Sequence, residues 1–193
     1  RKLAASGTFT YHFTSADGTR LHGWYWEHPQ PRAYLLYCHG NGDCVAYHAE
    51  YLERLSQSQR IAIFSFDYRG YGRSEGSPNE QGVMLDSAAA RDWLAERANL
   101  PAEQMVLMGR SLGGAAAVDL AAEKGARGVI LQNTFTSMPD VAAPMYWFLP
   151  VRWLMKTQMQ SVAKIKQYNG PLLQSHGTAD SLVPFAIGQK LFA

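Results

Sequence analysis

The sequence predicts an α/β fold with a mostly parallel central sheet and helices on both of its faces. Three observations predict it. Apolar runs without polar alternation stand at 33–40, 61–70 and 104–109, as strands buried on both faces require. Stretches of helical periodicity separate these runs. Glycines and polar residues gather where the runs end, and the carboxyl ends of parallel strands are where such sheets place their ligands.

The elements are expected in the following order. An antiparallel hairpin comes first, with strands at 8–14 and 21–28 around turn residues at 17–19. Further strands are predicted at 33–40, 61–70, 104–109, 128–135 and 171–177. Helices are predicted at 45–58, 84–98 and 112–123, and Pro184 opens a last one. A long irregular segment is predicted at about 137–168.

Length and composition indicate one globular domain over residues 1–193, with 47% hydrophobic residues. The net charge of +2 gives no electrostatic footprint for nucleic acid. The longest apolar run, Val141 to Val151, is shorter than the roughly 20 residues that a membrane-spanning helix needs. The chain begins without methionine and ends inside an expected helix, so we expect both ends to be cut. The compartment stays open between the cytoplasm and a membrane reached through an upstream segment.

The stretch "GRSLG" at 109–113 places Ser111 between a predicted strand and a predicted helix. The pattern G-x-S-x-G is weak by itself, because it arises by chance in glycine-rich chains. The strand before it and the helix after it are the context that a nucleophilic serine on a strained turn requires. The structural alternative is a plain strand-to-helix turn.

Between residues 38 and 184 the chain contains five motif-like stretches, in this order: "CHGNGD", "FDYRGYGRSEGSP", "GRSLGGA", "LQNTFTS" and "SHGTADSLVP". With them the chain resembles the α/β-hydrolase-fold serine hydrolases, and most of all the small single-domain acyl hydrolases of the α/β-hydrolase-domain group. The resemblance implies a nucleophile at Ser111 and an acid at Asp180. It also implies an oxyanion hole made by the backbone N–H groups of Asn41 and Leu112, and no metal or organic cofactor.

Two other aspartates need an interpretation. Asp140 is the alternative acid, because some members of the fold place the acid after the preceding strand; we expect it instead to cap the segment that begins there. Asp67 lies near the site but precedes the serine. We expect it to be structural and to fix its turn with Arg69 or Arg73.

The general base is missing from the expected place. The resemblance implies the chain order Ser, Asp, His, but no histidine follows Asp180. His176 is the least unsuitable substitute, although the family has a structural "HG" at that point. We therefore expect the base on a loop after a further strand, and expect that C-terminal strand and its helix to be missing here. A chain that truly ends at Ala193 would favour a catalytically inactive binding protein with the same fold.

Residues 140–160 carry too many large apolar side chains for a solvated loop. One prediction is a small cap-like segment at about 137–168 that forms a hydrophobic substrate pocket over the serine. A second is that the segment covers the core beside the sheet, and a third is a membrane-facing patch aided by Arg152 and Lys156. The pocket would be lined by Met145, Trp147 and Phe148.

The function predicted from these observations is a serine hydrolase that cleaves carboxylic esters or thioesters of a hydrophobic acyl substrate. The reaction would pass through an acyl-enzyme on Ser111. The expected partner is a small-molecule or lipid-like acyl substrate, with peripheral membrane contact left open. An amidase, a lipid hydrolase and a protein depalmitoylase are all compatible with the sequence.

Overall fold

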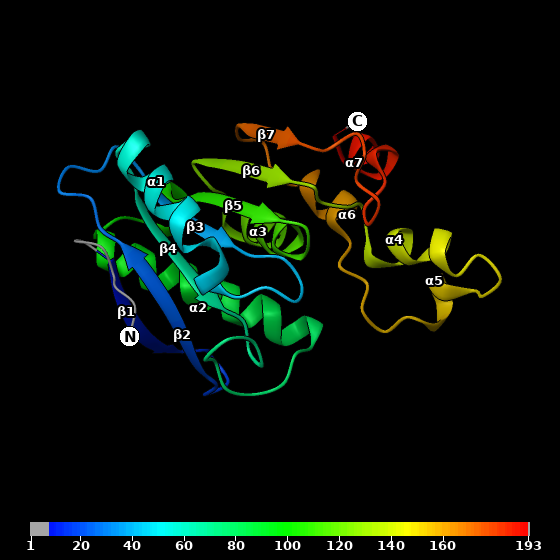
Figure 1. Ribbon diagram of the computed structural model, residues 1–193, viewed down its shortest axis with the longest axis horizontal. Coiled ribbons are helices and arrows are strands. Elements are labelled where there is room, and N and C mark those ends of the chain that lie inside the picture. Colours follow the sequence, from blue (N-terminus) through cyan, green and yellow to red (C-terminus); the bar gives the residue numbers. More distant parts are fainter. Residues whose placement is uncertain (1–7, 193) are drawn as a thin grey trace.

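A computed structural model describes residues 8–192, which form a seven-stranded sheet flanked by helices (Figure 1). The strand order is β1-β2-β4-β3-β5-β6-β7. β1 and β2 form an antiparallel hairpin, β2 runs antiparallel to β4, and all remaining pairs are parallel. The strands are β1 (Thr8–Thr14), β2 (Arg20–Trp26), β3 (Tyr34–Cys38), β4 (Ala62–Asp67), β5 (Val106–Arg110), β6 (Gly128–Gln132) and β7 (Leu172–Ser175).

The helices connect the parallel strands and then build the segment between β6 and β7. They are η1 (Val45–His48), α1 (Ala49–Gln59), α2 (Glu80–Ala98), η2 (Ala102–Gln104), α3 (Leu112–Lys124), α4 (Met138–Met145), α5 (Val151–Leu154), α6 (Ser161–Ile165) and α7 (Phe185–Phe192).

Alternating side chains of the central strands supply two hydrophobic cores. Leu36 of β3 faces the larger core, which α2, α3, α6 and α7 cover. Its neighbour Leu35 faces a smaller core on the other side of the sheet, which Leu52 of α1 closes. Successive side chains of a strand point to opposite faces, so an unbroken apolar run is what a sheet covered on both sides needs.

The predicted fold class is confirmed, with a mostly parallel sheet, an N-terminal antiparallel hairpin and helices on both faces. The prediction of a long irregular segment at about 137–168 is wrong, because α4, α5 and α6 lie within it. These helices have only eight, four and five residues. Helical periodicity is not readable over such short lengths, and prolines interrupt the pattern.

Candidate active site

Ser111 occupies a strained turn between β5 and α3. Its backbone has φ 50° and ψ −116°, a conformation that costs a non-glycine residue free energy and that clusters at functional sites. The flanking glycines make the turn sterically feasible. A Cβ at Gly109 would overlap the backbone of Gly113, and a Cβ at Gly113 would overlap the carbonyl of Cys38. The sequence pattern therefore reflects close backbone packing around the serine.

The end of β6 holds this turn in place. The Ser111 N–H donates to the carbonyl of Gln132 at 2.9 Å, and the Thr134 hydroxyl donates to the Ser111 carbonyl at 2.5 Å. A Cβ at Gly114 would overlap the Thr134 side chain, so the start of α3 is packed directly on this residue. Backbone strain persists only where the surroundings over-determine it, and these contacts supply that constraint.

The two residues predicted to supply the oxyanion donors lie in segments next to the turn of Ser111. Leu112 opens α3, so its N–H has no partner within the helix and lies at the positive end of the helix dipole. Asn41 follows β3 in a loop that lies against the turn: a Cβ built on Gly40 is 3.7 Å from the Cβ of Ser111. The structure thus brings the loop of Asn41 and the first residue of α3 to the same side chain.

The loop after β4 contacts the Asn41 loop and holds it in place. The Tyr68 hydroxyl, fully buried, donates to the carbonyl of His39 at 3.1 Å. The Tyr71 hydroxyl donates to the side-chain oxygen of Asn41. The rings of both tyrosines pack against the imidazole of His39. These contacts fix the backbone that carries the predicted donor.

Asp67 also holds the loops beside the site in place, and its role is structural, as expected. Its carboxylate accepts the N–H groups of Val45 at 2.8 Å and Arg73 at 3.2 Å, and it pairs with Nδ1 of His22 at 2.9 Å. Burial alone would raise the pKa of Asp67, but these hydrogen bonds outweigh it and lower the pKa below its usual value. Arg73 takes part only through its backbone.

Of the two arginines expected to fix the turn with Asp67, Arg73 does so and Arg69 does not. The Arg69 guanidinium points instead to Asp86 on α2, at 2.8 Å from Nη2, and to Asp17 at 2.7 Å from Nη1. The hydrogen bonds that Arg69 donates to these carboxylates, above all to Asp86, raise its pKa. The long side chain spans from the turn of the hairpin to α2, which local sequence does not indicate.

Asp180 lies in the loop after β7, at the same edge of the sheet as Ser111. One carboxylate oxygen accepts the N–H groups of Leu182 and Val183, both at 2.9 Å. The other accepts the side-chain N–H of Asn133 at 2.5 Å. Burial raises the pKa of Asp180, but the hydrogen bond from Asn133 and the two from the backbone outweigh it, so the pKa is lowered. The carboxylate is therefore held charged.

Asn133 is a functional candidate that sequence reasoning missed. It follows β6 with a left-handed backbone, φ 49°, and its N–H donates to the carbonyl of Ser175 at 2.9 Å. It thus stands between the turn of Ser111 on β5 and the loop of Asp180 on β7. The sequence signal that could have pointed to Asn133 is an asparagine directly after a buried strand. Asparagine tolerates the left-handed backbone region better than most residues, so it suits a sharp turn at that point.

Asp140 does not cap α4, contrary to expectation. Ser137 is the N-cap, and its hydroxyl accepts the N–H of Asp140 at 3.2 Å. The Asp140 carboxylate accepts the Thr136 hydroxyl and pairs with Arg152 at 2.6 Å. Burial raises the pKa of Asp140, but these hydrogen bonds and the arginine outweigh it and lower the pKa. The side chain is thus engaged in joining α4 to α5.

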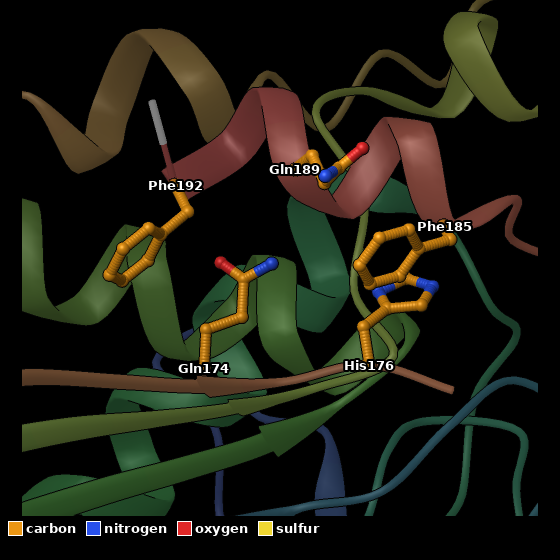
Figure 2. A pocket seen from close by; sticks show the side chains of 5 residues that line it. All are labelled: Gln174, His176, Phe185, Gln189 and Phe192. Atoms are coloured by element: carbon orange, nitrogen blue, oxygen red, sulfur yellow. The ribbon is translucent and has the colours of Figure 1, made fainter. Parts of the chain in front are cut away.

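His176 lies beside Asp180, with its Nε2 3.9 Å from the carboxylate, but no hydrogen bond joins its ring to the Ser111 hydroxyl. Its Nε2–H donates to the carbonyl of Val183 at 2.8 Å, and its Nδ1 is buried beneath Gly188 of α7. Figure 2 shows the ring at one end of a cavity of about 450 Å³ between β7 and α7. The cavity is lined by Gln174, His176, Phe185, Gln189 and Phe192, and neither Ser111 nor Asp180 borders it. Within residues 8–192, no hydrogen bond joins a histidine to the Ser111 hydroxyl.

The residues predicted to line a substrate pocket lie on the surface. Met145, Trp147 and Phe148 are 48%, 83% and 64% exposed, around the loop that joins α4 to α5. The alternative that these three side chains cover the core is therefore wrong, although Val141 and Met159 of the same segment pack on it. A pocket that these side chains form over the serine stays a prediction. In the part of the chain that the structure describes, no three His, Cys, Asp or Glu side chains gather to hold a metal ion.

Comparison with known proteins agrees with this architecture. Residues 34–167 match the family model described as the alpha/beta hydrolase fold. The Mycobacterium tuberculosis protein Rv2307c is 35% identical over 179 residues, which cover 92% of this chain and 63% of the relative. The alpha/beta hydrolase domain-containing protein WAV2 of Arabidopsis thaliana is 32% identical over 187 residues, 88% of this chain and 61% of the relative. The chain belongs to the alpha/beta hydrolase fold family.

A solved structure shows the same arrangement of elements. The esterase Pf2001 of Pyrococcus furiosus superposes with a TM-score of 0.76 at 20% identity, over 96% of this chain and 76% of the esterase. At that identity the match shows the fold alone. The chain spans less than two thirds of the length of the two relatives named above, at 63% and 61%.

Proposed function

We propose that the protein is a serine hydrolase that cleaves carboxylic esters or thioesters of a hydrophobic acyl substrate. The observation that carries the proposal is the backbone of Ser111, strained at φ 50° directly before the first N–H groups of α3. A serine in this position presents its hydroxyl to an incoming carbonyl, while helix N–H groups face the oxygen on which negative charge develops.

The proposed reaction has two steps. A base takes the proton of Ser111 as its oxygen attacks the carbonyl carbon, and the leaving alcohol or thiol departs with a proton to give an acyl-enzyme. Water then attacks this ester, the acid is released and the serine regains its proton. The N–H groups of Leu112 and Asn41 stabilise the oxyanion in both steps, and such donors contribute about 3–4 kcal/mol each.

The base in this proposal is a histidine outside residues 1–193, oriented by Asp180. Two features support it: the carboxylate is held charged at the edge where Ser111 lies, and His176 is engaged with Val183. The alternative is a binding protein with the same fold, which the lack of a hydrogen bond from any histidine of residues 8–192 to the Ser111 hydroxyl favours. The two are distinguished by activity of the full-length natural protein.

The test is hydrolysis of p-nitrophenyl esters of increasing acyl length by the full-length protein and by its Ser111→Ala variant. We expect turnover that the variant lacks, and a rise of kcat/KM from acetate toward medium chains. Activity that survives in Ser111→Ala would refute the serine mechanism. A fall of kcat/KM with chain length would count against the hydrophobic substrate while leaving the serine mechanism in place.

A further inference from the structure

The loop between α4 and α5 exposes a concentrated set of large apolar side chains. We call residues 145–156 the α4–α5 tip. Trp147 is 83% and Trp153 is 91% exposed, which is close to full exposure for side chains of this size. Isolated exposed apolar residues need no explanation, but a contiguous group marks an interaction site. The exposed group includes Tyr146, Trp147, Phe148, Leu149, Trp153 and Leu154.

The tip is a folded feature. Backbone hydrogen bonds hold it in shape: the Tyr146 N–H donates to the carbonyl of Ala142 in α4 at 3.0 Å, and the Leu149 N–H donates to the carbonyl of Tyr146 at 2.9 Å. The pair of Arg152 with Asp140 at 2.6 Å ties α5 to α4, and the Val151 side chain at the start of α5 is buried. The apolar side chains are therefore held outward by ordered structure, at no further cost in ordering the chain.

The tip projects from the body of the molecule. Figure 1 shows α4, α5 and their loop standing clear of the sheet, on the side toward which the arrows of β5 and β6 point. The tip residues line none of the cavities between β7 and α7, along α2, or beside η2, and a helix or an extended peptide docks by filling a groove. A soft, continuous phase that yields to the side chains suits this shape better than a rigid protein surface.

The charge of the segment indicates which kind of soft surface it would bind. From residue 141 to residue 179 the sequence contains no aspartate or glutamate, whereas it contains Arg152, Lys156, Lys164 and Lys166. Lys156 lies in the tip and is exposed, whereas Arg152 is paired with Asp140 and Lys164 with Asp119. Exposed basic groups beside an apolar face are attracted to anionic lipid headgroups, each contributing about 1 kcal/mol near the surface.

We propose that the α4–α5 tip docks onto the surface of a bilayer that contains anionic phospholipid. The indoles and the Tyr146 ring lie at headgroup level, Phe148, Leu149 and Leu154 reach the acyl boundary, and Lys156 contacts lipid phosphates. Among residues 8–192, no helix is long and apolar enough to cross a membrane. Docking in this way turns the edge that carries Ser111 toward the lipid. The proposal does not depend on ester hydrolysis.

The test is co-sedimentation of the full-length protein with vesicles of phosphatidylcholine containing about a quarter phosphatidylglycerol. The double variant Trp147→Ser/Trp153→Ser should bind at least about tenfold more weakly, because each indole removes a large apolar area from water when it inserts. The matched control is Leu100→Ser. This residue is also exposed but lies between α2 and β5, at the opposite edge of the sheet, and its loss should change binding by less than about twofold.

A second variant covers the case in which the double variant does not fold. Lys156→Glu changes one exposed side chain and should weaken binding to anionic vesicles more than to pure phosphatidylcholine. Equal binding of the wild type and both tip variants would overturn the proposal. So would a concentration-dependent dimer of the wild type, seen by sedimentation velocity, that the tryptophan substitutions abolish, because the tip would then be a contact between two copies. Hydrolytic activity enters none of these readouts.

Discussion

Replacing Asp86 by alanine should destabilise the protein strongly, because this carboxylate is fully buried and serves one partner. It accepts three hydrogen bonds from Arg69: the N–H at 2.8 Å, Nε at 3.1 Å and Nη2 at 2.8 Å. The Arg69 side chain is only 8% exposed. The variant would leave a guanidinium and a backbone N–H buried with their main acceptor gone.

The expected loss in the free energy of unfolding depends on which partners Arg69 keeps. Removing one member of a buried ion pair typically costs about 3–5 kcal/mol. Asp17 still pairs with one nitrogen of Arg69, so we expect the lower end, about 3 kcal/mol. With a urea slope near 2 kcal/mol per molar, the unfolding midpoint should fall by about 1.5 M.

The assay is urea unfolding followed by circular dichroism, with Glu50→Ala as the control. Glu50 pairs with Arg54 on the exposed face of α1, and its loss should change the free energy of unfolding by less than about 0.5 kcal/mol. The double change Arg69→Met/Asp86→Leu should be more stable than Asp86→Ala alone. A loss below about 1 kcal/mol in Asp86→Ala, or an equal loss in the control, would refute this reasoning.

Three further predictions concern the site. Asn133→Ala should raise the pKa of Asp180 toward its ordinary value, measured by NMR of the carboxyl carbon, because one charge-assisted hydrogen bond is lost; an unchanged pKa would contradict the assigned contact. Asp180→Asn should be less stable than the wild type at neutral pH, and the difference should fade as the pH falls below about 4, since a carboxyl with a lowered folded pKa stabilises only while ionised; a gap that persists in acid would argue against it. Tyr71→Phe should lower kcat on p-nitrophenyl acetate with little change in KM, by less than the roughly hundredfold loss of a direct oxyanion donor, because Tyr71 only orients Asn41.

The parts of the fold that the sequence predicts well rest on local pattern. The apolar runs of β3 and β4 indicate strands because both faces of each are buried, as Leu35 and Leu36 show. Ser111 is recognisable because a turn this tight admits only glycine at Gly109 and Gly113. These are short-range constraints, so neighbouring letters in the chain carry them.

The parts that the sequence does not predict depend on contacts between distant residues. Asn133 contacts Asp180 across 47 positions, and Arg69 contacts Asp86 across 17. Nothing near Arg69 distinguishes Asp86 from Asp67 as its partner, because the choice depends on how α2 packs against the loop after β4. Such pairings are set by tertiary packing, for which a single sequence offers no pattern.

Covalent labelling of the full-length natural protein with a fluorophosphonate, read by intact mass and by peptide mapping, tests whether Ser111 is the nucleophile. We expect one adduct, on the peptide that contains Ser111, and none in the Ser111→Ala variant. A folded protein that forms no adduct, or an adduct on another serine, would contradict the assignment of Ser111 as the nucleophile and favour a binding protein with the same fold.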